Sequence, residues 1–305
     1  MILTIFGAPK PFRGAAAAAQ WNAIMSWASL RPRPQIILMG DAEGADQMSR
    51  DIGALHVPDV ARNEFGTPLV SSLFTLAAAH AEHAVVCYAN ADVMFTDTLP
   101  RAAQTAAGRW DSFLLTGRRY DVPLGGRWEF GDPHWQSALD ALARHRGRLD
   151  PWIAADYFVF PRGQFTDVPP FALGRTVWDN WLIYAARAAR IAVVDATAAV
   201  LAVHQRHDYS HHRGGREGVW EGREAQRNRA LAGGVDHAFC VADATHVLTR
   251  SGRLWPAIRP VYLWRRAYAW PVFQPRARVV RGVLQAVLAM SRPLRRRMGW
   301  TLGPR

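Results

Sequence analysis

The chain has 305 residues, of which 50% are apolar, so it can bury one large core or two modest ones. This composition excludes a disordered protein and favours one mixed catalytic domain with an appendage. The formal net charge is +12, and the imbalance is confined to one end of the chain. Residues 251–305 contain twelve arginines and no acidic residue, so the first 250 residues are neutral.

The spacing of the cysteines and the first residues of the chain indicate in which cellular compartment the protein is expected. Cys87 and Cys240 lack the paired spacing of a disulfide framework or a zinc site, which favours a reducing environment. The strand-like segment 3–6 begins almost at once, without the basic region, apolar stretch and cleavage site of a signal peptide. We therefore expect a cytoplasmic protein.

Strands alternate with helices along the first half, a pattern that builds a parallel sheet covered by helices. The expected strands are 3–6, 35–39 and 83–88; the expected helices are 15–30, 45–55 and an alanine-rich stretch that follows the loop 62–68 and ends near residue 83. The second half is less regular, with a strand at 112–116, a helix near 135–146, and apolar stretches at 157–160 and 191–194.

The third of these strands runs into two polar residues, Asn90 and Asp92. Residues two apart on a strand share a face, and ligands of open α/β sheets bind at the carboxyl ends of the strands. A departing nucleoside diphosphate needs a divalent metal or several cationic groups beside it. Asp92 is therefore a candidate ligand for Mg²⁺ or Mn²⁺, and Asn90 a candidate ligand or ribose contact. The alternative is an ordinary turn, which Asn and Asp also favour.

The segment 90–92 resembles the DxD motif of GT-A glycosyltransferases, with Asn in the first place. The likeness follows the order of motifs over about the first 210 residues. Segment 4–9 resembles the strand and loop that receive the nucleoside, and Asp41 with Glu43 falls where the base is often held. Three further segments resemble parts of these enzymes. They are 62–66, which precedes the strand 83–88 and its candidate metal ligand; 178–181, which resembles the acidic acceptor-site motif; and 203–209, which resembles a late segment that carries a histidine.

This resemblance implies an α/β fold, namely a GT-A-like Rossmann-type mixed sheet flanked by helices, with a basic C-terminal helical tail. It implies a nucleotide-binding cleft formed by Ala8, Asp41 and Asn63, with Asn90 beside it. Asp92 and His204 would hold Mn²⁺ or Mg²⁺ against the diphosphate. Because an amide binds a hard cation more weakly than a carboxylate does, a metal-independent variant stays open.

Two further carboxylates are candidate catalytic residues. Asp179 would be the general base in an inverting reaction, or would orient donor or acceptor in a retaining one. It could equally cap a helix. Asp156 would face a sugar, or finish a turn after Pro151.

Other polar residues leave the assignment open. His204 follows an apolar run and could be a core residue, while the neighbouring candidates are His207, His211 and His212. Arginines that could hold phosphate, or lie solvated on the surface, are Arg118, Arg119 and Arg175. No GxGxxG or Walker motif follows the first strand, which disfavours a dehydrogenase or a kinase.

The basic tail also carries large aromatic residues and an apolar run at 283–290. That run is far shorter than the ~20 residues of a spanning helix. Aromatic residues and arginines suit the lipid headgroup region, so we expect peripheral association with the inner face of the cell membrane. The alternative is that the tail packs on the domain; a nucleic-acid partner is not expected.

We expect a catalytic domain at 1–250 and a basic aromatic tail at 251–305. The expected reaction moves a sugar from a nucleoside diphosphate, UDP first, to a glycan or lipid-linked acceptor in polysaccharide biosynthesis. One rival is a sugar nucleotidyltransferase, whose Gly-rich, Lys- or Arg-bearing loop is not seen after Phe6. The other is a non-catalytic membrane-surface binding protein.

Overall fold

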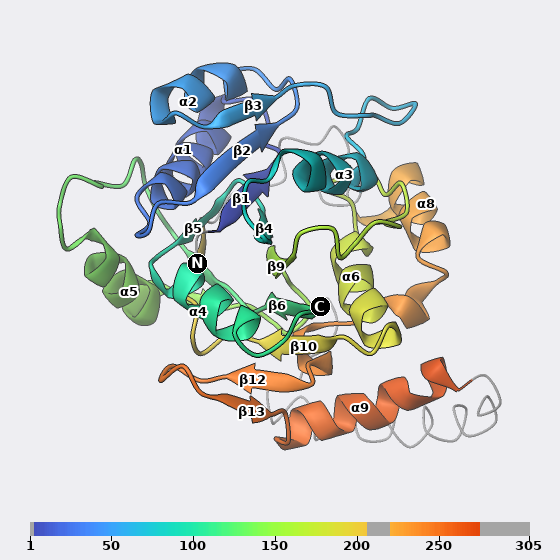
Figure 1. The fold of residues 1–305 in the computed structure, drawn as a ribbon. Helices are drawn as coiled ribbons and strands as arrows, with labels where there is room; N and C mark the ends of the chain where they lie inside the picture. The colour runs from blue at the N-terminus through green and yellow to red at the C-terminus, as the bar shows by residue number, and fades with distance from the viewer. Residues whose placement is uncertain (1–2, 206–219, 275–305) are drawn as a thin grey trace.

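The computed structural model describes residues 3–205 and 220–274. Within these residues the chain forms two β-sheets and a set of surrounding helices (Figure 1). The strands of the larger sheet are β1 (Thr4–Gly7), β2 (Gln35–Met39), β3 (Leu55–Val57), β4 (Val85–Ala89), β6 (Phe113–Thr116), β9 (Tyr157–Pro161), β10 (Ala192–Asp195), β12 (His246–Leu248) and β13 (Leu254–Pro256). The strands of the smaller sheet are β5 (Val93–Phe95), β7 (Tyr120–Val122), β8 (Arg148–Leu149) and β11 (Ala202–Gln205).

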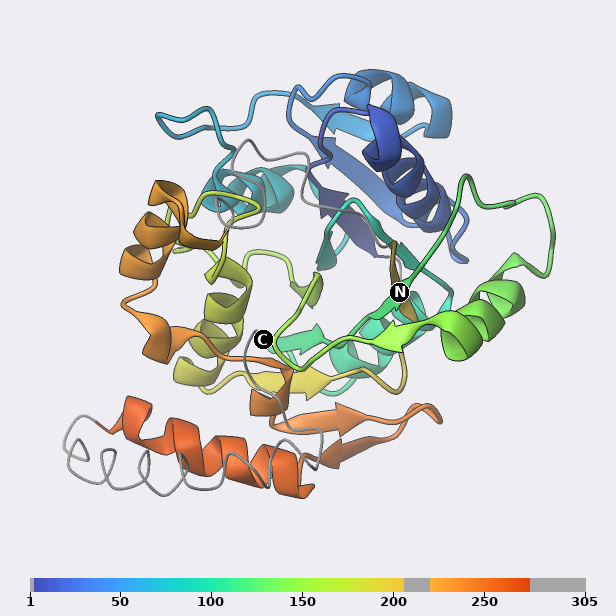
Figure 2. The same ribbon diagram turned by 180° about the vertical axis from the view of Figure 1, so that it is seen from behind.

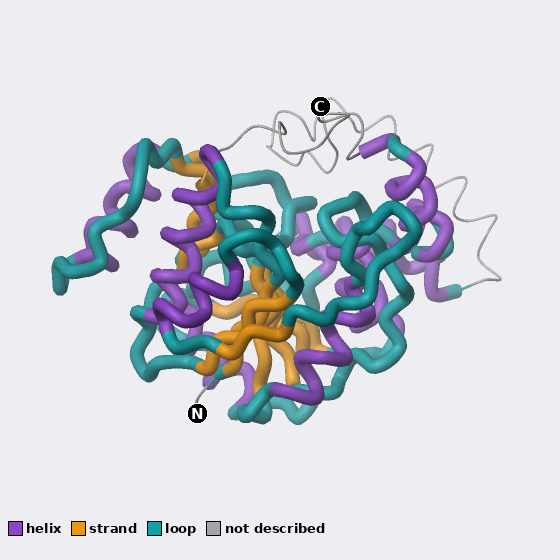
Figure 3. Tube along the Cα trace, turned by 90° about the horizontal axis from the view of Figure 1, so that it is seen from above, coloured by secondary structure: helices purple, strands orange, loops and turns teal. Residues whose placement is uncertain are grey.

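The helices lie mostly between consecutive strands of the larger sheet. They are α1 (Gly14–Ala28), α2 (Ala45–Ile52), α3 (Val70–His80), α4 (Thr98–Ala107), α5 (Trp135–Arg146), α6 (Trp178–Ala188), α8 (Arg223–Leu231) and α9 (Pro260–Phe273). Two single 3₁₀ turns, η1 (Val235–His237) and η2 (Val241–Asp243), precede β12. In Figure 3 the strands lie in the middle with helices on either side.

The larger sheet is mixed, with the order β13-β12-β10-β6-β9-β4-β1-β2-β3. β1 pairs in parallel with β2 and with β4, whereas β9 runs antiparallel between β4 and β6. The mixed α/β sheet flanked by helices, which the sequence predicts, is therefore confirmed. The chain builds β1, β2 and β3 outward in one direction and then returns to place β4 on the other side of β1. In sheets with such a reversal, ligands bind in the crevice beyond the carboxyl ends of the strands where the order reverses, which here are β1 and β4.

Alternate residues of the central strands enter the cores on opposite faces of the sheet. Ile5 and Cys87 join the core under α1, α2, α4 and α5, while Phe6 and Tyr88 join the core under α3, α6 and α9. All four residues of β1 are buried, as expected for a strand that is covered on both faces. The two helical layers thus hold the carboxyl ends of β1 and β4 in a fixed position.

One expected element ends earlier than the sequence suggests. The predicted helix 45–55 is wrong beyond Ile52, because Gly53 adopts a left-handed conformation with φ 64° and terminates α2. The chain then forms the edge strand β3, which pairs with β2. The helix predicted at 135–146 coincides with α5.

The C-terminal part of the described chain packs on the larger sheet. β13 pairs antiparallel with β12, and α9 runs beside this hairpin at the edge of the sheet farthest from β3 (Figures 1 and 2). The expected boundary at residue 250 lies in the turn of the hairpin. The apolar run 283–290 lies outside the described residues. None of the described helices has both the length and the apolar character needed to cross a membrane.

Candidate active site

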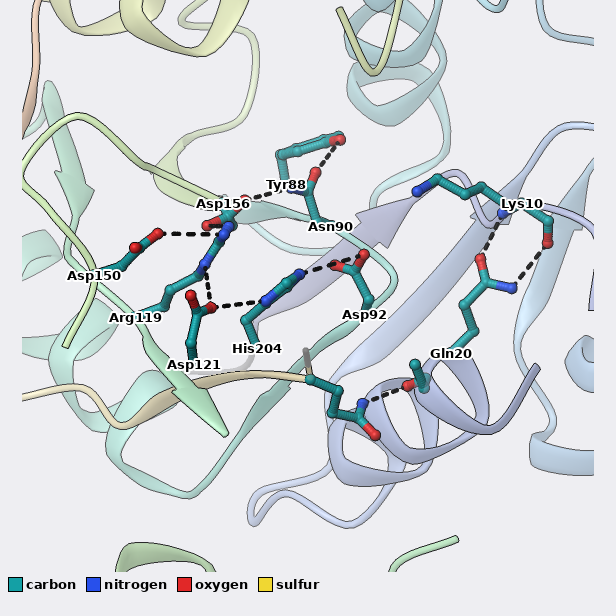
Figure 4. Close-up of polar contacts among 12 residues, drawn as sticks. Lys10, Gln20, Tyr88, Asn90, Asp92, Arg119, Asp121, Asp150, Asp156 and His204 are labelled. Atoms are coloured by element: carbon teal, nitrogen blue, oxygen red, sulfur yellow. Dashed lines mark hydrogen bonds and ion pairs between the residues drawn. The ribbon is translucent and has the colours of Figure 1, made fainter. Parts of the chain in front are cut away.

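β1 and β4 are neighbours in the sheet, and their backbones lie close together at their carboxyl ends. A Cβ atom on Gly7 would lie 2.5 Å from the backbone oxygen of Ala89, so only glycine fits there. The loop that follows β1 is anchored at Lys10, whose backbone N–H and carbonyl both bond the side-chain amide of Gln20 on α1, at 2.5 and 2.9 Å. The side chain of Lys10 extends from this loop toward the side on which Tyr88 and Asn90 lie (Figure 4).

Asn90 and Asp92 lie in the turn between β4 and β5. The N–H of Val93 donates to the carbonyl of Asn90 at 3.1 Å, so the chain reverses here and strand alternation does not set the direction of the two side chains. They take different partners. Asn90 bonds Asp156, and Asp92 approaches His204 (Figure 4).

The smaller sheet brings Asp92, His204 and Asp121 together. In its register His204 of β11 lies opposite Val93 of β5 on one side and opposite Asp121 of β7 on the other. Nδ1 of His204 lies 2.9 Å from an Oδ1 of Asp121, and Nε2 lies 3.8 Å from an Oδ2 of Asp92. Because a carboxylate can only accept, Nδ1 of His204 donates the hydrogen bond to Asp121, and Nε2 is the ring nitrogen that faces Asp92.

Arg119 lies among three carboxylates. Its guanidinium pairs with Asp156 and lies 3.3 Å from both Asp150 and Asp121. Burial opposes the charged form, but the carboxylates, Asp156 foremost, raise the pKa of Arg119 above its usual value. We call these residues, with His204 and Asp92, the Arg119 cluster; their side chains are only 10 to 16% exposed.

The cluster also perturbs its own carboxylates. Burial raises the pKa of Asp150, and the nearby Arg119 only partly opposes this. For Asp121 burial acts in the same direction, but the hydrogen bond from His204 and the charge of Arg119 outweigh it and lower the pKa. The two carboxylates therefore differ in proton affinity although both face the same guanidinium.

Antiparallel pairing of β4 with β9 explains the contact between Asn90 and Asp156. Ala89 lies opposite Tyr157, so the next pair of residues along the ladder is Asn90 and Asp156. The backbone N–H of Asn90 donates to the carbonyl of Asp156 at 2.9 Å, and its side-chain amide donates to the carboxylate at 2.7 Å. The hydroxyl of Tyr88 donates to the side-chain oxygen of Asn90 at 2.8 Å, so the amide orientation is determined on both sides.

Asp179 lies in the first turn of α6. Val177, at the start of this helix, has φ of 85°, a conformation that costs energy for a β-branched residue and that is found most often at functional sites. The ring of Trp178 packs on Tyr88 with centroids 5.0 Å apart. Burial raises the pKa of Asp179 to about 7, although backbone N–H groups of the helix oppose this. A carboxylate with this pKa is suited to proton transfer near neutral pH.

The residues expected to hold the nucleoside lie in the loops that follow β1, β2 and β3. Ala8 follows β1 directly and is half-buried. Asp41 is exposed and pairs with Arg62. The side chain of Asn63 accepts from the N–H of Thr67 at 2.9 Å and donates to Glu224 at 2.7 Å. Among the described residues, neither Asp41 nor Asn63 bonds the Arg119 cluster, and their nucleotide contacts stay predictions.

Two of the candidate arginines have internal partners. Arg175 pairs with Glu224 at 2.7 Å, and Arg118 donates to the carbonyl of Asp150 at 2.6 Å. The alternative histidines His207, His211 and His212 lie outside the described residues. Among the expected site residues, the structure therefore brings together Asn90, Asp92, Asp156 and His204.

A divalent cation would find two protein donors here. Asp92 supplies carboxylate oxygens and His204 an imidazole nitrogen, while Asp121 fixes the imidazole, an arrangement typical of metal-bound histidine. No group of three or more acidic, histidine or cysteine side chains suited to a metal occurs in residues 3–205 and 220–274. Mg²⁺ is commonly bound by one or two protein ligands together with substrate phosphates, so this donor set fits a metal that arrives with a nucleotide.

Three residues of the site escaped the sequence interpretation. Asp121 and Asp150 are distant in sequence from the motifs, and only strand register reveals them. Lys10 had a visible signal, since it is the only lysine in a chain of 37 basic residues. It lies in the loop after β1, and within the described residues its ammonium group forms no ion pair.

The sequence matches no family model, and no curated protein matches it at a significant level. Solved structures resemble it at low identity. One is glucosyl-3-phosphoglycerate synthase from Mycobacterium tuberculosis in complex with Mg²⁺ and UDP, with 12% identity, coverage of 76% of this chain and 80% of that chain, and a TM-score of 0.45. Another is S. aureus TarS, with 13% identity, coverage of 68% of this chain and a TM-score of 0.43. The chain spans only 37% of the length of TarS.

Proposed function

We propose that the protein is a glycosyltransferase that transfers a sugar from a nucleoside diphosphate to an acceptor hydroxyl. The observation that carries the proposal is the set of side chains beyond the carboxyl end of β4. Asp92 and His204 lie at the carboxyl end of β4, and a carboxyl group with a pKa of about 7 lies on the neighbouring helix α6. A cation held by Asp92 and His204 would assist departure of the diphosphate, and the carboxyl group on α6 could accept the proton of the acceptor hydroxyl in an inverting reaction.

Asp92 and His204 would hold Mn²⁺ or Mg²⁺ in this reaction. The bound cation would supply positive charge to the departing diphosphate. Asp121 would fix the orientation of the His204 imidazole, because it accepts a hydrogen bond from Nδ1. Asn90 and Asp156 then shape the crevice beside the diphosphate, and Arg119 holds Asp156 in position.

Asp179 would accept the proton of the acceptor hydroxyl if the reaction inverts the anomeric centre. With a pKa of about 7, a large fraction of this carboxyl group is ionised at neutral pH, and the raised pKa makes it a stronger base than an exposed carboxylate. If the reaction retains the configuration, Asp179 would instead orient the donor or the acceptor. Asp156 is the second candidate to contact a sugar.

Lys10 would contact the donor diphosphate from the opposite side. The Arg119 cluster contains four carboxylates and one guanidinium, so an approaching dianion needs further cations. Lys10 is held by Gln20 in the loop after β1, at the edge of the same crevice. Ala8, Asp41, Asn63 and Asn90 would bind the nucleoside, for which we expect uridine, and a glycan or lipid-linked acceptor would complete the reaction.

Calorimetric titration tests the donor site. Wild type and the Asp92→Ala variant would be titrated with UDP, GDP and CDP, with and without Mn²⁺. Binding of one nucleotide that depends on the metal and is lost in Asp92→Ala supports the proposal. The matched control is Asp111→Ala, which alters an exposed aspartate at the amino end of β6 and should bind like wild type. Absence of binding by the wild type would contradict a transferase.

Product analysis separates the two rival functions. A sugar nucleotidyltransferase would release pyrophosphate from a nucleoside triphosphate in the presence of a sugar phosphate. A non-catalytic protein would bind the nucleotide tightly and leave every UDP-sugar intact. Release of UDP from a UDP-sugar, dependent on an added acceptor, identifies the proposed reaction.

A further inference from the structure

The surface formed by β13 and α9 exposes large hydrophobic side chains. Trp255 is 55% exposed, Ile258 67%, Leu263 47% and Trp270 52%. In the described residues only three other large hydrophobic side chains are comparably exposed, and they lie in other parts of the sequence. A cluster of this kind, unlike scattered single residues, indicates an interaction surface.

The helical repeat places two of them, Leu263 and Trp270, on the outward side of α9. Leu263 and Trp270 are seven residues apart and therefore share a face, as do Arg259 and Arg266. All four are exposed, whereas Val261, Tyr262, Arg265 and Ala269 are buried against the domain. We call Trp255, Ile258, Arg259, Leu263, Arg266 and Trp270 the α9 face.

Buried polar contacts hold α9 in this orientation. Arg265 forms a bidentate pair with Asp243 of η2, with its Nε 2.9 and 3.0 Å from the two carboxylate oxygens. The hydroxyl of Tyr262 donates to Asp195 at 2.6 Å. The helix thus buries the charged Arg265 beside its apolar residues and exposes Leu263 and Trp270. Rotation that would bury Leu263 and Trp270 would break the Arg265–Asp243 pair, so their exposure is built into the fold.

The chemistry of the α9 face matches one class of partner. Its charges are all positive, and no acidic residue occurs anywhere from residue 251 to the end of the chain. Tryptophan is favoured at the boundary between lipid headgroups and acyl chains, and arginine pairs with anionic headgroups. We infer that the α9 face docks on the surface of an anionic lipid bilayer, with α9 lying in the plane of the interface.

Other occupants fit the surface less well. Contact with a second copy across a two-fold axis would bring Arg259 and Arg266 against the same residues of that copy, where like charges repel. A nucleic-acid backbone would use the arginines but would leave the aliphatic side chains Ile258 and Leu263 without apolar contact. A lipid surface uses both kinds of side chain.

Sedimentation of the full-length protein with vesicles tests the inference. We expect binding to vesicles of phosphatidylcholine mixed with phosphatidylglycerol, weaker binding to phosphatidylcholine alone, and weakening by salt. The double variant Leu263→Gln, Trp270→Gln should lose about tenfold or more in vesicle affinity, because both apolar anchors are removed. The matched control is Leu55→Gln, Phe65→Gln, which alters two exposed residues away from the C-terminal hairpin and should bind like wild type.

Three outcomes would overturn the inference. One is equal vesicle binding by the two double variants, which would place lipid contact elsewhere in the chain. Another is preference for duplex DNA over vesicles, and the third is a concentration-dependent dimer that the Leu263→Gln, Trp270→Gln variant loses. Circular dichroism and thermal unfolding establish that each variant is folded. UDP binding measured on the Leu263→Gln, Trp270→Gln variant should be unchanged, so the result is independent of the proposed transferase activity.

Discussion

One guanidinium, that of Arg119, balances the charge of Asp121, Asp150 and Asp156 inside the protein. Replacement by methionine would keep much of the volume and leave the carboxylates without their counter-charge. We expect Arg119→Met to lower the free energy of unfolding by about 3–5 kcal/mol at neutral pH, the usual cost of breaking a buried ion pair. Urea denaturation measures this loss.

The loss should shrink as the pH falls. Asp121 has a lowered pKa in the wild type, so the stability that it contributes is present above its unfolded-state pKa and disappears as it becomes protonated in acid. Arg144→Met is the matched control, because Arg144 pairs with Asp140 on the surface and is 43% exposed. Its cost should be below about 1 kcal/mol. Equal losses in the two variants would contradict a buried charge cluster.

The raised pKa of Asp179 predicts how kcat/KM depends on pH. If Asp179 is the general base of an inverting reaction, it must be ionised, and because its pKa is raised to about 7, kcat/KM should rise with pH through about 7 and then level off. Asp179→Asn should lower kcat by a factor on the order of 10²–10⁴ and retain nucleotide binding. The range from pH 5 to 8 extends roughly one pH unit or more on either side of this pKa, so it should show the change in ionisation. A kcat/KM profile that is flat over this range would exclude Asp179 as the base.

Lys10 can be labelled selectively among side chains by an amine-reactive reagent, because the chain contains no other ε-amine. If its ammonium contacts the diphosphate, Lys10→Met should weaken UDP binding by about tenfold, the loss of one charge-assisted contact, and leave uridine binding unchanged. Arg13→Met is the control in the same loop, since Arg13 pairs with Glu43 at the surface. Saturating UDP should also protect Lys10 from an amine-reactive reagent. Equal labelling with and without UDP would place Lys10 outside the donor site.

At the scale of helices and strands, long elements were predictable and short ones were not. The strand 35–39 and the helix 135–146 carry enough residues for their pattern to be recognised, and both coincide with the structure. β5, β7 and β8 have only two or three residues each, too few to show alternation. These strands nevertheless form the smaller sheet, on which the approach of His204 to Asp92 depends.

The sequence was enough to place Asn90 and Asp92 at the end of a strand, but their shared face was wrong, because they lie in a turn and take different partners, and their roles stay predictions. The candidate site was not predictable where two strands must align. Asp156 meets Asn90 through the register of β4 and β9, and Asp121 meets His204 through that of β7 and β11. Strand register depends on contacts between residues far apart in the sequence, so local sequence patterns do not predict it. The left-handed φ of Val177 is likewise invisible in the residue name.

At the scale of the whole molecule, the described residues beyond 250 share the fold of the sheet domain. β13 extends the larger sheet, and Arg265 of α9 pairs with Asp243, whose side chain is 1% exposed. Asp243 also accepts from the backbone N–H of Cys240 at 2.8 Å. Removal of α9 would therefore take away the cation that pairs with the Asp243 carboxylate and uncover the surface on which the helix packs. We expect α9 to unfold together with the sheet and not as an independent tail.

Substitution of Arg265 tests this cooperativity. Arg265→Met should lower the thermal midpoint of the entire protein in one transition, with a loss of about 3–5 kcal/mol, because Asp243 keeps its charge without a partner cation. Arg266→Met alters the adjacent, exposed arginine and should change the midpoint little. Scanning calorimetry distinguishes the possibilities, since a separate low-temperature transition in the wild type would mean that α9 is an autonomous element. A single transition that shifts as a whole would mean that the helix bearing the α9 face is held as firmly as the candidate active site, because both belong to one cooperative unit.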